Sequence, residues 1–218
     1  MQNTVALFVS VPVASFRVPR AREYFETLPC PPPSTVYGML LSLVGETNRH
    51  AHEGAELAIA LVSQPNYSVV LRTLWRVKSR QQGLGQGENK RPDFQELLTN
   101  VRALVWVRQG AEETAATSLA VRVHEAITQP HSVSRFGGLS LGESTHLVDE
   151  LRLAREDDVI AGRALLNDEA GELSLPIWPD HVGSRKTSWR QFSLQETAIG
   201  LTPDGRSWVP IRRNAYSA

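Results

Sequence analysis

Cysteine, net charge and long apolar runs are all scarce in this sequence. Its single cysteine, Cys30, excludes an intramolecular disulfide and a cysteine-rich zinc site. A lone cysteine also fits a reducing compartment. No apolar run has the roughly 20 residues that a membrane-spanning helix needs, and Met1–Asn3 does not begin a signal peptide. We therefore expect a soluble, cytoplasmic protein that makes no membrane contact.

The net charge is zero, because 23 Lys and Arg residues balance 23 Asp and Glu residues. This balance argues against a protein that coats nucleic acid over its whole surface, but it permits a local basic stripe. A chain of 218 residues can bury a proper core, as one large domain or as a domain with an appendage.

Motifs for cofactors and metals are absent as well. "GLGQG" (83–87) lacks the flanking strand and helix and the Lys-Ser/Thr pair of a phosphate-binding loop. The only acidic run, Glu156–Asp158, lies beside Arg152 and Arg155 and is typical of a solvated turn rather than a metal nuclease site. We expect neither a cofactor nor a metal.

Alternating apolar residues predict strands, and apolar residues three or four positions apart predict helices. The expected elements are a strand at 5–14, a helix at 34–45, strands at 55–63, 67–80 and 101–109, a helix at 111–129 and a strand near 147–153. Pro12 indicates an edge or bulge at the end of the first strand. The order β-α-β-β-α-β is that of the ferredoxin-like fold. Further short strands are expected at 173–178, 187–196 and 207–212. We predict an α+β chain with a ferredoxin-like core over 1–155 and a small β-rich C-terminal extension over 156–218.

The expected strand 67–80 has a basic side. Arg76, Lys78 and Arg80 alternate with residues of the other side, where Trp75 is expected to enter the core. The Gly-rich stretch that follows is expected to form a flexible tip carrying Lys90 and Arg91, so that 70–108 makes one long hairpin. Because a solvated face usually mixes charge signs, this row favours contact with RNA or a protein partner. A merely solvated strand face is the alternative.

Three prolines, Pro31–Pro33, stand directly before the expected helix at 34–45. They prevent the helix from beginning earlier, and Ser34 or Thr35 can cap its first turn. The free N–H groups at a helix start suit an anion such as phosphate. The alternative interpretation is an ordinary rigid loop that precedes a core helix.

Two motifs carry a resemblance to a known family. "CPPPSTVYGMLL" (30–41) and "FGGLSLGESTHLVDE" (136–150) resemble the Cas-five family of CRISPR-associated proteins, in particular its DevS-like branch. Cys30 stands where that family has Phe or Tyr. The resemblance implies a RAMP-type ferredoxin-like core with a protruding basic hairpin, the thumb, over about 76–102. It also implies a prokaryotic, cytoplasmic protein.

The same resemblance implies a function. The chain would be a non-catalytic subunit of a type I CRISPR Cascade effector complex, which binds the 5′ handle of CRISPR RNA (crRNA) and caps the backbone filament next to the large subunit. It would thereby support RNA-guided DNA targeting. Its partners would be the crRNA handle, the Cascade backbone subunit, the large subunit and target DNA near the PAM.

The resemblance also indicates which residues would touch RNA. Handle bases would stack on Tyr37, Phe136 or Trp75, and glycines would let backbone N–H groups approach phosphate. For Tyr37, a core position is an equal alternative. The expected RNA-binding residues are Arg17, Arg20, Ser34, Thr35, Tyr37, Arg76, Lys78, Arg80, Lys90, Arg91, Arg135, Phe136, Gly137 and Gly138.

One branch of the family cuts precursor crRNA, so a metal-independent endoribonuclease is the alternative function. Such cleavage needs a general base and a general acid within hydrogen-bond reach. Tyr37 is a candidate, but no Lys-His pair lies near a strand end, and we expect His146 to be structural and His52 to lie in a loop. The non-catalytic interpretation is therefore preferred. A protein-interaction module that never touches RNA is a third possibility.

Overall fold

The structure is a computed structural model, and it describes residues 4–18, 24–158, 161–180 and 186–213. Strand β1 (Val5–Ala14) runs through the centre of the molecule. Its alternating side chains divide between two sides of the sheet: Leu7 and Val9 enter the larger core cluster, whereas Phe8 enters the smaller one. The period-2 pattern of residues 5–14 therefore predicts this strand correctly.

The described residues form ten strands in one sheet, whose main path is β6-β1-β5-β3-β7-β9-β8. All pairings are antiparallel except the short parallel contact of β2 with β5. The prediction of a mixed chain of helices and strands is confirmed. The strands after β1 are β2 (Tyr24–Phe25), β3 (Glu56–Leu61), β4 (Asn66–Trp75), β5 (Lys90–Arg108), β6 (Glu150–Leu153), β7 (Ala161–Asn167), β8 (Leu173–Trp178), β9 (Ser188–Ala198) and β10 (Val209–Pro210).

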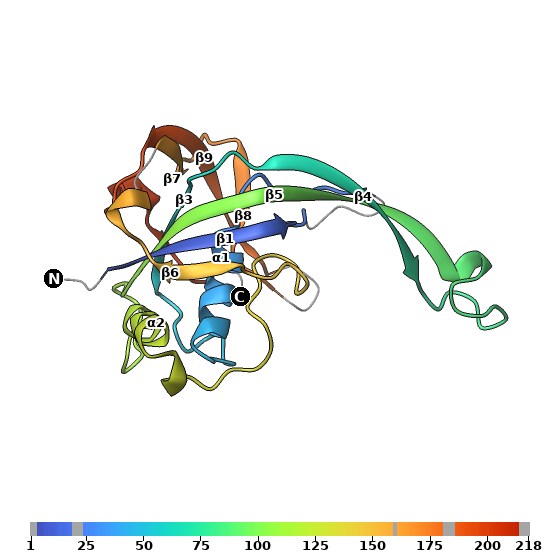
Figure 1. Cartoon of the computed structure of the whole chain (residues 1–218), viewed down its shortest axis with the longest axis horizontal. Helices are drawn as coiled ribbons and strands as arrows, with labels where there is room; N and C mark the ends of the chain where they lie inside the picture. Colours follow the sequence, from blue (N-terminus) through green and yellow to red (C-terminus); the bar gives the residue numbers. More distant parts are fainter. Residues whose placement is uncertain (1–3, 19–23, 159–160, 181–185, 214–218) are drawn as a thin grey trace.

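Helices α1 (Pro33–Leu43) and α2 (Leu119–Thr128) lie together on one side of the sheet (Figure 1). Leu40 of α1 and Val123 of α2 are fully buried in the larger core cluster, against the inward side of β1. Both helices were expected from the sequence. Within the described parts of the chain, no helix is long and apolar enough to cross a membrane.

Helix α2 begins eight residues later than its pattern predicts. Ser118 caps it by accepting a hydrogen bond from the Val121 N–H, and residues 111–118 form a loop instead. Glu113 of that loop is buried and accepts a hydrogen bond from the Leu119 N–H at 2.7 Å.

The sequence patterns missed strand β7 altogether, because Ala, Gly and Asn, which have low strand propensity, make up much of it.

Strands β4 and β5 form a hairpin that projects well beyond the helices (Figure 1). Strand β4 ends at Trp75 rather than at residue 80, and β5 begins at Lys90 rather than at 101. On the core side, β5 bends at Asn100, whose φ is +59°, at the register position opposite Pro12. The β1–β5 register is the same on both sides of Pro12, so there is no bulge at this position. Among the described strands, β1 pairs only with β5 beyond Ser10, so Pro12 lies on an edge, which is the other possibility that it indicated.

The tip of the hairpin, residues 76–89, is built around one buried side chain. The Asn89 Oδ1 accepts hydrogen bonds from the Lys78 and Ser79 N–H groups at 2.7 and 2.8 Å. The Asn89 Nδ2 donates to the Ser79 and Gln82 carbonyls at 2.8 and 2.7 Å. This wrapping turns the chain away from the β4 direction, so the expected extended basic strand is wrong. Lys90 and Arg91 lie at the start of β5 rather than in the tip, and the flexibility expected of the tip stays a prediction.

Replacing Asn89 with Ala removes the centre of the tip. We expect faster amide hydrogen exchange over residues 76–89 and little change in the free energy of unfolding of the whole chain, because the tip lies outside the core. Each lost hydrogen bond contributes about 1 kcal/mol locally. Gln81→Ala, an exposed amide in the same tip, is the matched control. Equal protection of the tip in both variants would contradict the role of Asn89.

Candidate functional site

The basic residues of the hairpin tip fall into two groups. Arg76 donates through Nε to the Glu88 carbonyl at 3.1 Å, and the Lys78 Nζ lies 3.2 Å from the Glu88 carboxylate. Arg80 and Lys90 are exposed, and the described residues supply no hydrogen bond or ion pair to either side chain. Arg80 in the tip and Lys90 directly after it are therefore the cations of this described region that are available to a ligand.

Arg91 belongs to neither group, because it is partly buried and its Nε lies 2.9 Å from the Asp93 carboxylate. The expected single basic strand face is also wrong for Arg76, Lys78 and Arg80, since β4 has already ended before them.

Trp75 lies on the surface with 69% of its area exposed, so the expectation of a core position is wrong. The reason is that the hairpin extends past the helices that would have covered this face (Figure 1). Gly85, at φ +72°, lies against the indole, where a Cβ would come within 2.8 Å of the ring. One indole face is thus supported by the tip. Lys90 is the register partner of Trp75.

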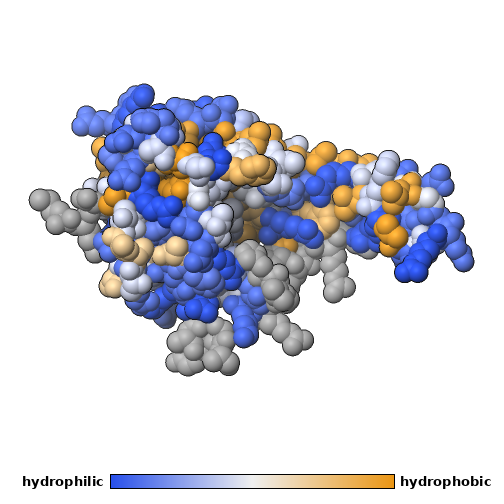
Figure 2. All heavy atoms as spheres, turned by 90° about the horizontal axis from the view of Figure 1, so that it is seen from below, coloured by the Kyte–Doolittle hydropathy of each residue, from blue (hydrophilic) through white to orange (hydrophobic). Residues whose placement is uncertain are grey.

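The same hairpin carries an apolar surface. Tyr67, Val69 and Leu71 alternate along β4 on the side of Trp75, and Phe94 of β5 is the register partner of Leu71. These four side chains and that of Trp75 are all exposed. Figure 2 shows hydrophobic residues along the projecting hairpin, next to hydrophilic ones. An exposed apolar surface of this kind marks a site of contact with another molecule.

The proline stretch does not make the expected anion shelf. Helix α1 begins at Pro33, with Pro32 at the N-cap position and no side-chain cap, so Ser34 and Thr35 are first-turn residues rather than caps. The prolines have no N–H, and the Thr35 N–H is already bonded to the Pro32 carbonyl at 2.9 Å. Few donors are therefore left for phosphate at this helix start.

Tyr37 belongs to the core. Only 3% of it is exposed, and its hydroxyl donates to the Arg49 carbonyl at 2.8 Å. Its ring packs at 6.1 Å from the ring of Trp178, and burial raises the pKa of the hydroxyl. Neither base stacking nor proton transfer to RNA can occur from this position. Tyr37 is therefore removed from the expected RNA-binding residues and from the candidates for catalysis.

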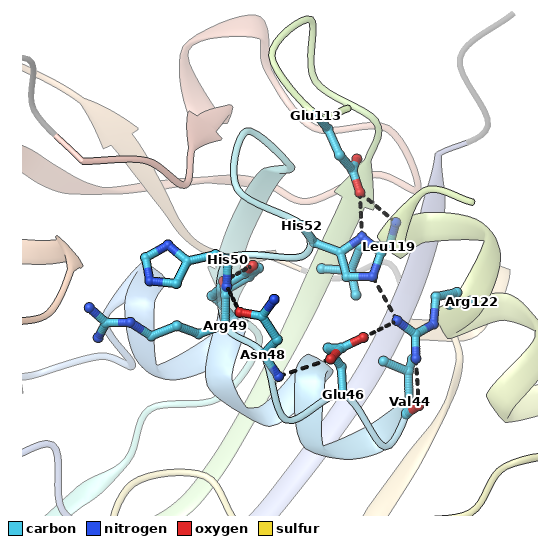
Figure 3. A network of polar contacts seen from close by, with 10 residues as sticks. Val44, Glu46, Asn48, Arg49, His50, His52, Glu113, Leu119 and Arg122 are labelled. Atoms are coloured by element: carbon cyan, nitrogen blue, oxygen red, sulfur yellow. Dashed lines mark hydrogen bonds and ion pairs between the residues drawn. The ribbon is translucent and has the colours of Figure 1, made fainter. Parts of the chain in front are cut away.

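His52 is the centre of a buried network that sequence reasoning missed (Figure 3). Its Nε2 lies 2.9 Å from the Arg122 guanidinium, and its Nδ1 lies 2.8 Å from the Glu113 carboxylate. Because a guanidinium only donates, Nε2 accepts and Nδ1 carries the proton. Arg122 also bonds Glu46 at 2.7 Å, which holds the pKa of that carboxyl below its usual range. With both ring nitrogens engaged, His52 joins the loop after α1 to α2.

The motif around His146 ties β1 to the base of the hairpin. The His146 Nδ1 accepts hydrogen bonds from the Ser15 and Glu143 N–H groups, both at 3.2 Å. The Glu143 carboxylate accepts from the Gln95 Nε2 at 2.8 Å and lies 3.5 Å from the Arg72 guanidinium. The structural role expected for His146 is confirmed.

Phe136 is the most exposed aromatic side chain of the glycine-rich loop and is in full contact with solvent. It lines a surface hollow of about 550 Å³ with Arg135 and residues at the C-terminal end of α1. Gly137, at φ +77°, accepts a hydrogen bond from Arg135 through its carbonyl, and Gly138 lies against Leu147. The loop therefore presents an aromatic ring and a cation together.

The remaining expected residues lie elsewhere. The Arg17 guanidinium lies 4.0 Å from the centre of the Phe25 ring, near the base of the hairpin. Arg20 falls outside the described residues. Ser34 and Thr35, at the start of α1, are at the opposite end of that helix from Phe136. Across the described ranges, no three His, Cys, Asp or Glu side chains gather as a metal site would require.

Comparison with known proteins decides the family. A family model described as CRISPR-associated protein (Cas_Cas5) matches residues 4–217. A Myxococcus xanthus (strain DK1622) protein described as CRISPR-associated protein Cas5 is 47% identical over 212 residues, which cover 97% of this chain and 99% of that protein. The chain belongs to the Cas5 family. The resemblance predicted from residues 30–41 and 136–150 is thereby confirmed.

Solved structures show the same fold at low sequence identity. A chain of a "CRISPR RNA-guided surveillance complex" is similar with a TM-score of 0.64 and 14% identity, covering 94% of the Cas5-family chain and 95% of its own length. A "Crystal structure of Cas protein" is similar with a TM-score of 0.51 and 14% identity, covering 93% and 99%.

His146 makes the stability of the chain depend on pH. Burial lowers its pKa below the value of about 6.5 that it has when unfolded, although the Glu143 carboxylate opposes this shift. The folded state thus favours neutral His146, so this stabilisation is present above pH 6.5 and is lost as the pH falls through the folded pKa. We expect the free energy of unfolding, measured with urea, to fall as the pH is lowered from 7 through the folded pKa of His146.

His146→Asn keeps an acceptor but does not titrate, so its unfolding free energy should fall less over the same pH range. His124→Asn, at an exposed position on α2, is the control and should behave as the unchanged chain does. An identical pH dependence in His146→Asn and the unchanged chain would refute the assignment.

Proposed function

We propose that this Cas5-family chain is a non-catalytic subunit of a type I CRISPR Cascade effector complex. In this role it binds the 5′ handle of crRNA, caps the backbone filament and lies next to the large subunit, close to target DNA near the PAM. Two findings support the proposal: membership of a CRISPR-associated family, and a fold similar to that of a chain in an RNA-guided surveillance complex.

We further propose that β1-α1-β3-β5-α2-β6 is a ferredoxin-like core. The strand order β6-β1-β5-β3, with both helices on one side, supports this interpretation. The β4–β5 hairpin then corresponds to the thumb. The strands after residue 156 extend the sheet beyond β3, in agreement with a C-terminal β-rich extension packed on a core over 1–155.

The observation that carries the RNA-binding proposal is the pairing of cation and aromatic ring at the hairpin tip. Arg80 and Lys90 are exposed, and the described residues leave both without an ion pair. Trp75, the register partner of Lys90, exposes its indole on the same hairpin. Cations hold the phosphates of single-stranded RNA, and aromatic rings stack its bases. Phe136 with Arg135 repeats this pairing on the glycine-rich loop.

The apolar hairpin surface of Val69, Leu71 and Phe94 suits a protein partner rather than phosphate. We assign it to the backbone subunit, because one side of the hairpin would then face protein while its tip reaches RNA.

The non-catalytic assignment rests on the two best candidates for proton transfer, neither of which is available to RNA. Tyr37 is buried, and His52 uses both ring nitrogens in hydrogen bonds within the chain.

The decisive experiment is to incubate the purified chain in EDTA with labelled repeat RNA and with a mature guide carrying its 5′ handle. We expect a shift of the handle RNA on a native gel and no new band on a denaturing gel. A discrete metal-independent cut would instead establish the endoribonuclease alternative. If neither RNA shifts nor is cut, the interaction-module interpretation replaces the proposal.

Replacing Arg80 and Lys90 together with Ala should weaken handle binding and make it less sensitive to salt. Each phosphate contact on single-stranded RNA contributes roughly 0.7 to the slope of log K against log salt, so the slope should fall by about 1.4. Fluorescence anisotropy at several salt concentrations measures it. Arg155→Ala/Lys186→Ala removes two exposed cations elsewhere and is the matched control. Equal slopes in both variants would exclude the tip as the phosphate site.

Trp75→Ala should lower RNA affinity without changing the salt slope, because stacking carries no charge. The expected loss is about 1–3 kcal/mol of binding free energy. Trp75→Phe keeps an aromatic face and should recover most of the affinity. If Phe and Ala are equally damaging, Trp75 supports the tip rather than a base, and hydrogen exchange over residues 76–89 will report that difference.

A further inference from the structure

A second hollow lies at the base of the hairpin, far from its tip. It has a volume of about 260 Å³ and five separate segments line it. Pro29 comes from the stretch before α1, Tyr67 from the start of β4, and Arg163 and Glu196 from the neighbouring strands β7 and β9. Gln64 adds an amide. Aromatic and proline walls with a few polar groups are typical of a small, specific binding site.

Arg163 is unusual among the partly buried arginines of the sheet. Arg108 lies 2.6 Å from Glu56, and Arg152 lies 2.6 Å from Asp158. The Arg163 Nε is shut off from solvent and has no hydrogen-bond partner, and no described residue forms an ion pair with its guanidinium. The Nε itself is out of reach of another molecule. Arg163 as a whole is only partly buried and lines the hollow, so its other N–H donors, which no described residue bonds, are the ones that an acceptor from another molecule can meet.

The position of Arg163 is fixed by its strand. Gly162, the preceding residue, lies so close to β3 that a Cβ there would come within 2.4 Å of the Leu61 carbonyl oxygen. Arg163 is the register partner of both Leu61 and Glu196. Cross-strand partners point to the same side of a sheet, so Arg163 and Glu196 both face the hollow. They do so without pairing with each other, which leaves a donor group and an acceptor group side by side.

We propose that this hollow binds one guanine base of single-stranded RNA. Guanine has two acceptors, O6 and N7, which match the paired donors of an Arg guanidinium. It also has two donors, N1–H and the 2-amino group, which a carboxylate accepts. Arg163 and Glu196 supply these two partners, and the Tyr67 ring packs against the base. Adenine lacks O6, and the pyrimidines lack N7. The inference rests on the proposed RNA-binding function and adds base selectivity to it.

The test uses the full chain and short labelled RNAs, UUGUU, UUAUU, UUCUU and UUUUU, in fluorescence anisotropy titrations at one salt concentration. We expect UUGUU to bind about tenfold or more tightly than the others, as a bidentate Arg contact provides. 7-Deazaguanine lacks N7 but keeps O6, so it should remove one of the two hydrogen bonds to Arg163. Inosine lacks the 2-amino group but keeps N1–H, so it should remove one of the two hydrogen bonds to Glu196. In Arg163→Ala, 7-deazaguanine and guanine should bind equally well.

Arg163→Lys and Arg155→Ala are the two companion variants. A lysine keeps the charge but cannot make the bidentate contact, so it should not restore the preference for guanine. Arg155→Ala should keep it. Thermal unfolding separates binding from structure: removing an unpaired guanidinium should leave the melting temperature of Arg163→Ala unchanged or raised, whereas a structural role would lower it by several degrees.

The remaining outcomes are distinct. Salt-dependent RNA binding with no preference among the four bases overturns the guanine site and leaves the proposed function intact. An equal loss of affinity for all four RNAs in Arg163→Ala, with a shallower salt dependence, would show a phosphate contact and also overturn it. Failure of the unchanged chain to bind any RNA, including the crRNA handle, overturns both proposals.

Discussion

The continuous backbone of β5 is the constraint on which the rest of the structure depends. Its C-terminal half lies between β1 and β3 with most of its side chains buried, and its N-terminal half pairs with β4 and is mostly less buried. The hydrogen bonds of a sheet are cooperative along a strand, so the buried half orders the exposed half. A two-stranded hairpin alone is only marginally stable in water. The projecting arm therefore keeps its shape because it is the end of a core strand.

Polar side chains also hold the base of the β4–β5 hairpin against neighbouring segments of the chain. Glu143, held by the His146 motif, reaches Gln95 and Arg72 at the hairpin base. The Glu96 carboxylate accepts a hydrogen bond from the Thr27 N–H on another side. The glycine-rich motif, one of the two that carry the family resemblance, thus holds the hairpin base through Glu143 and also exposes Phe136. One segment both holds the arm in place and presents the aromatic ring that we assign to RNA.

Local sequence patterns predicted the elements whose ends are set locally. The alternation of apolar residues at every second position predicted strand β1. Helical spacing of apolar residues directly after three prolines predicted helix α1. The tip could not be predicted, because one amide at Asn89 binds chain segments up to 11 residues away and thereby ends β4 at Trp75. The start of α2 depends in the same way on Glu113, whose partner His52 is 61 residues distant.

For the candidate site, composition identified the right residue types but not their surroundings. Helical spacing placed Tyr37 beside the apolar side of α1 and left core and surface equally open, because only the packing of Trp178 against it decides between them. Arg163 had no signal in the sequence. Its importance lies in the absence of a partner, and that absence appears only when β7 is seen between β3 and β9.

Asn100 sets the direction in which the hairpin points. It adopts a positive φ that Asn tolerates better than most residues, where β5 passes from its core partners to β4. Ten residues separate it from Lys90, a span of about 33 Å in an extended strand. The arm therefore acts as a lever: a change of about 10° in the bend would displace the tip by about 6 Å over that length. A single backbone angle near the core thus determines where the tip lies relative to any molecule that the rest of the chain holds.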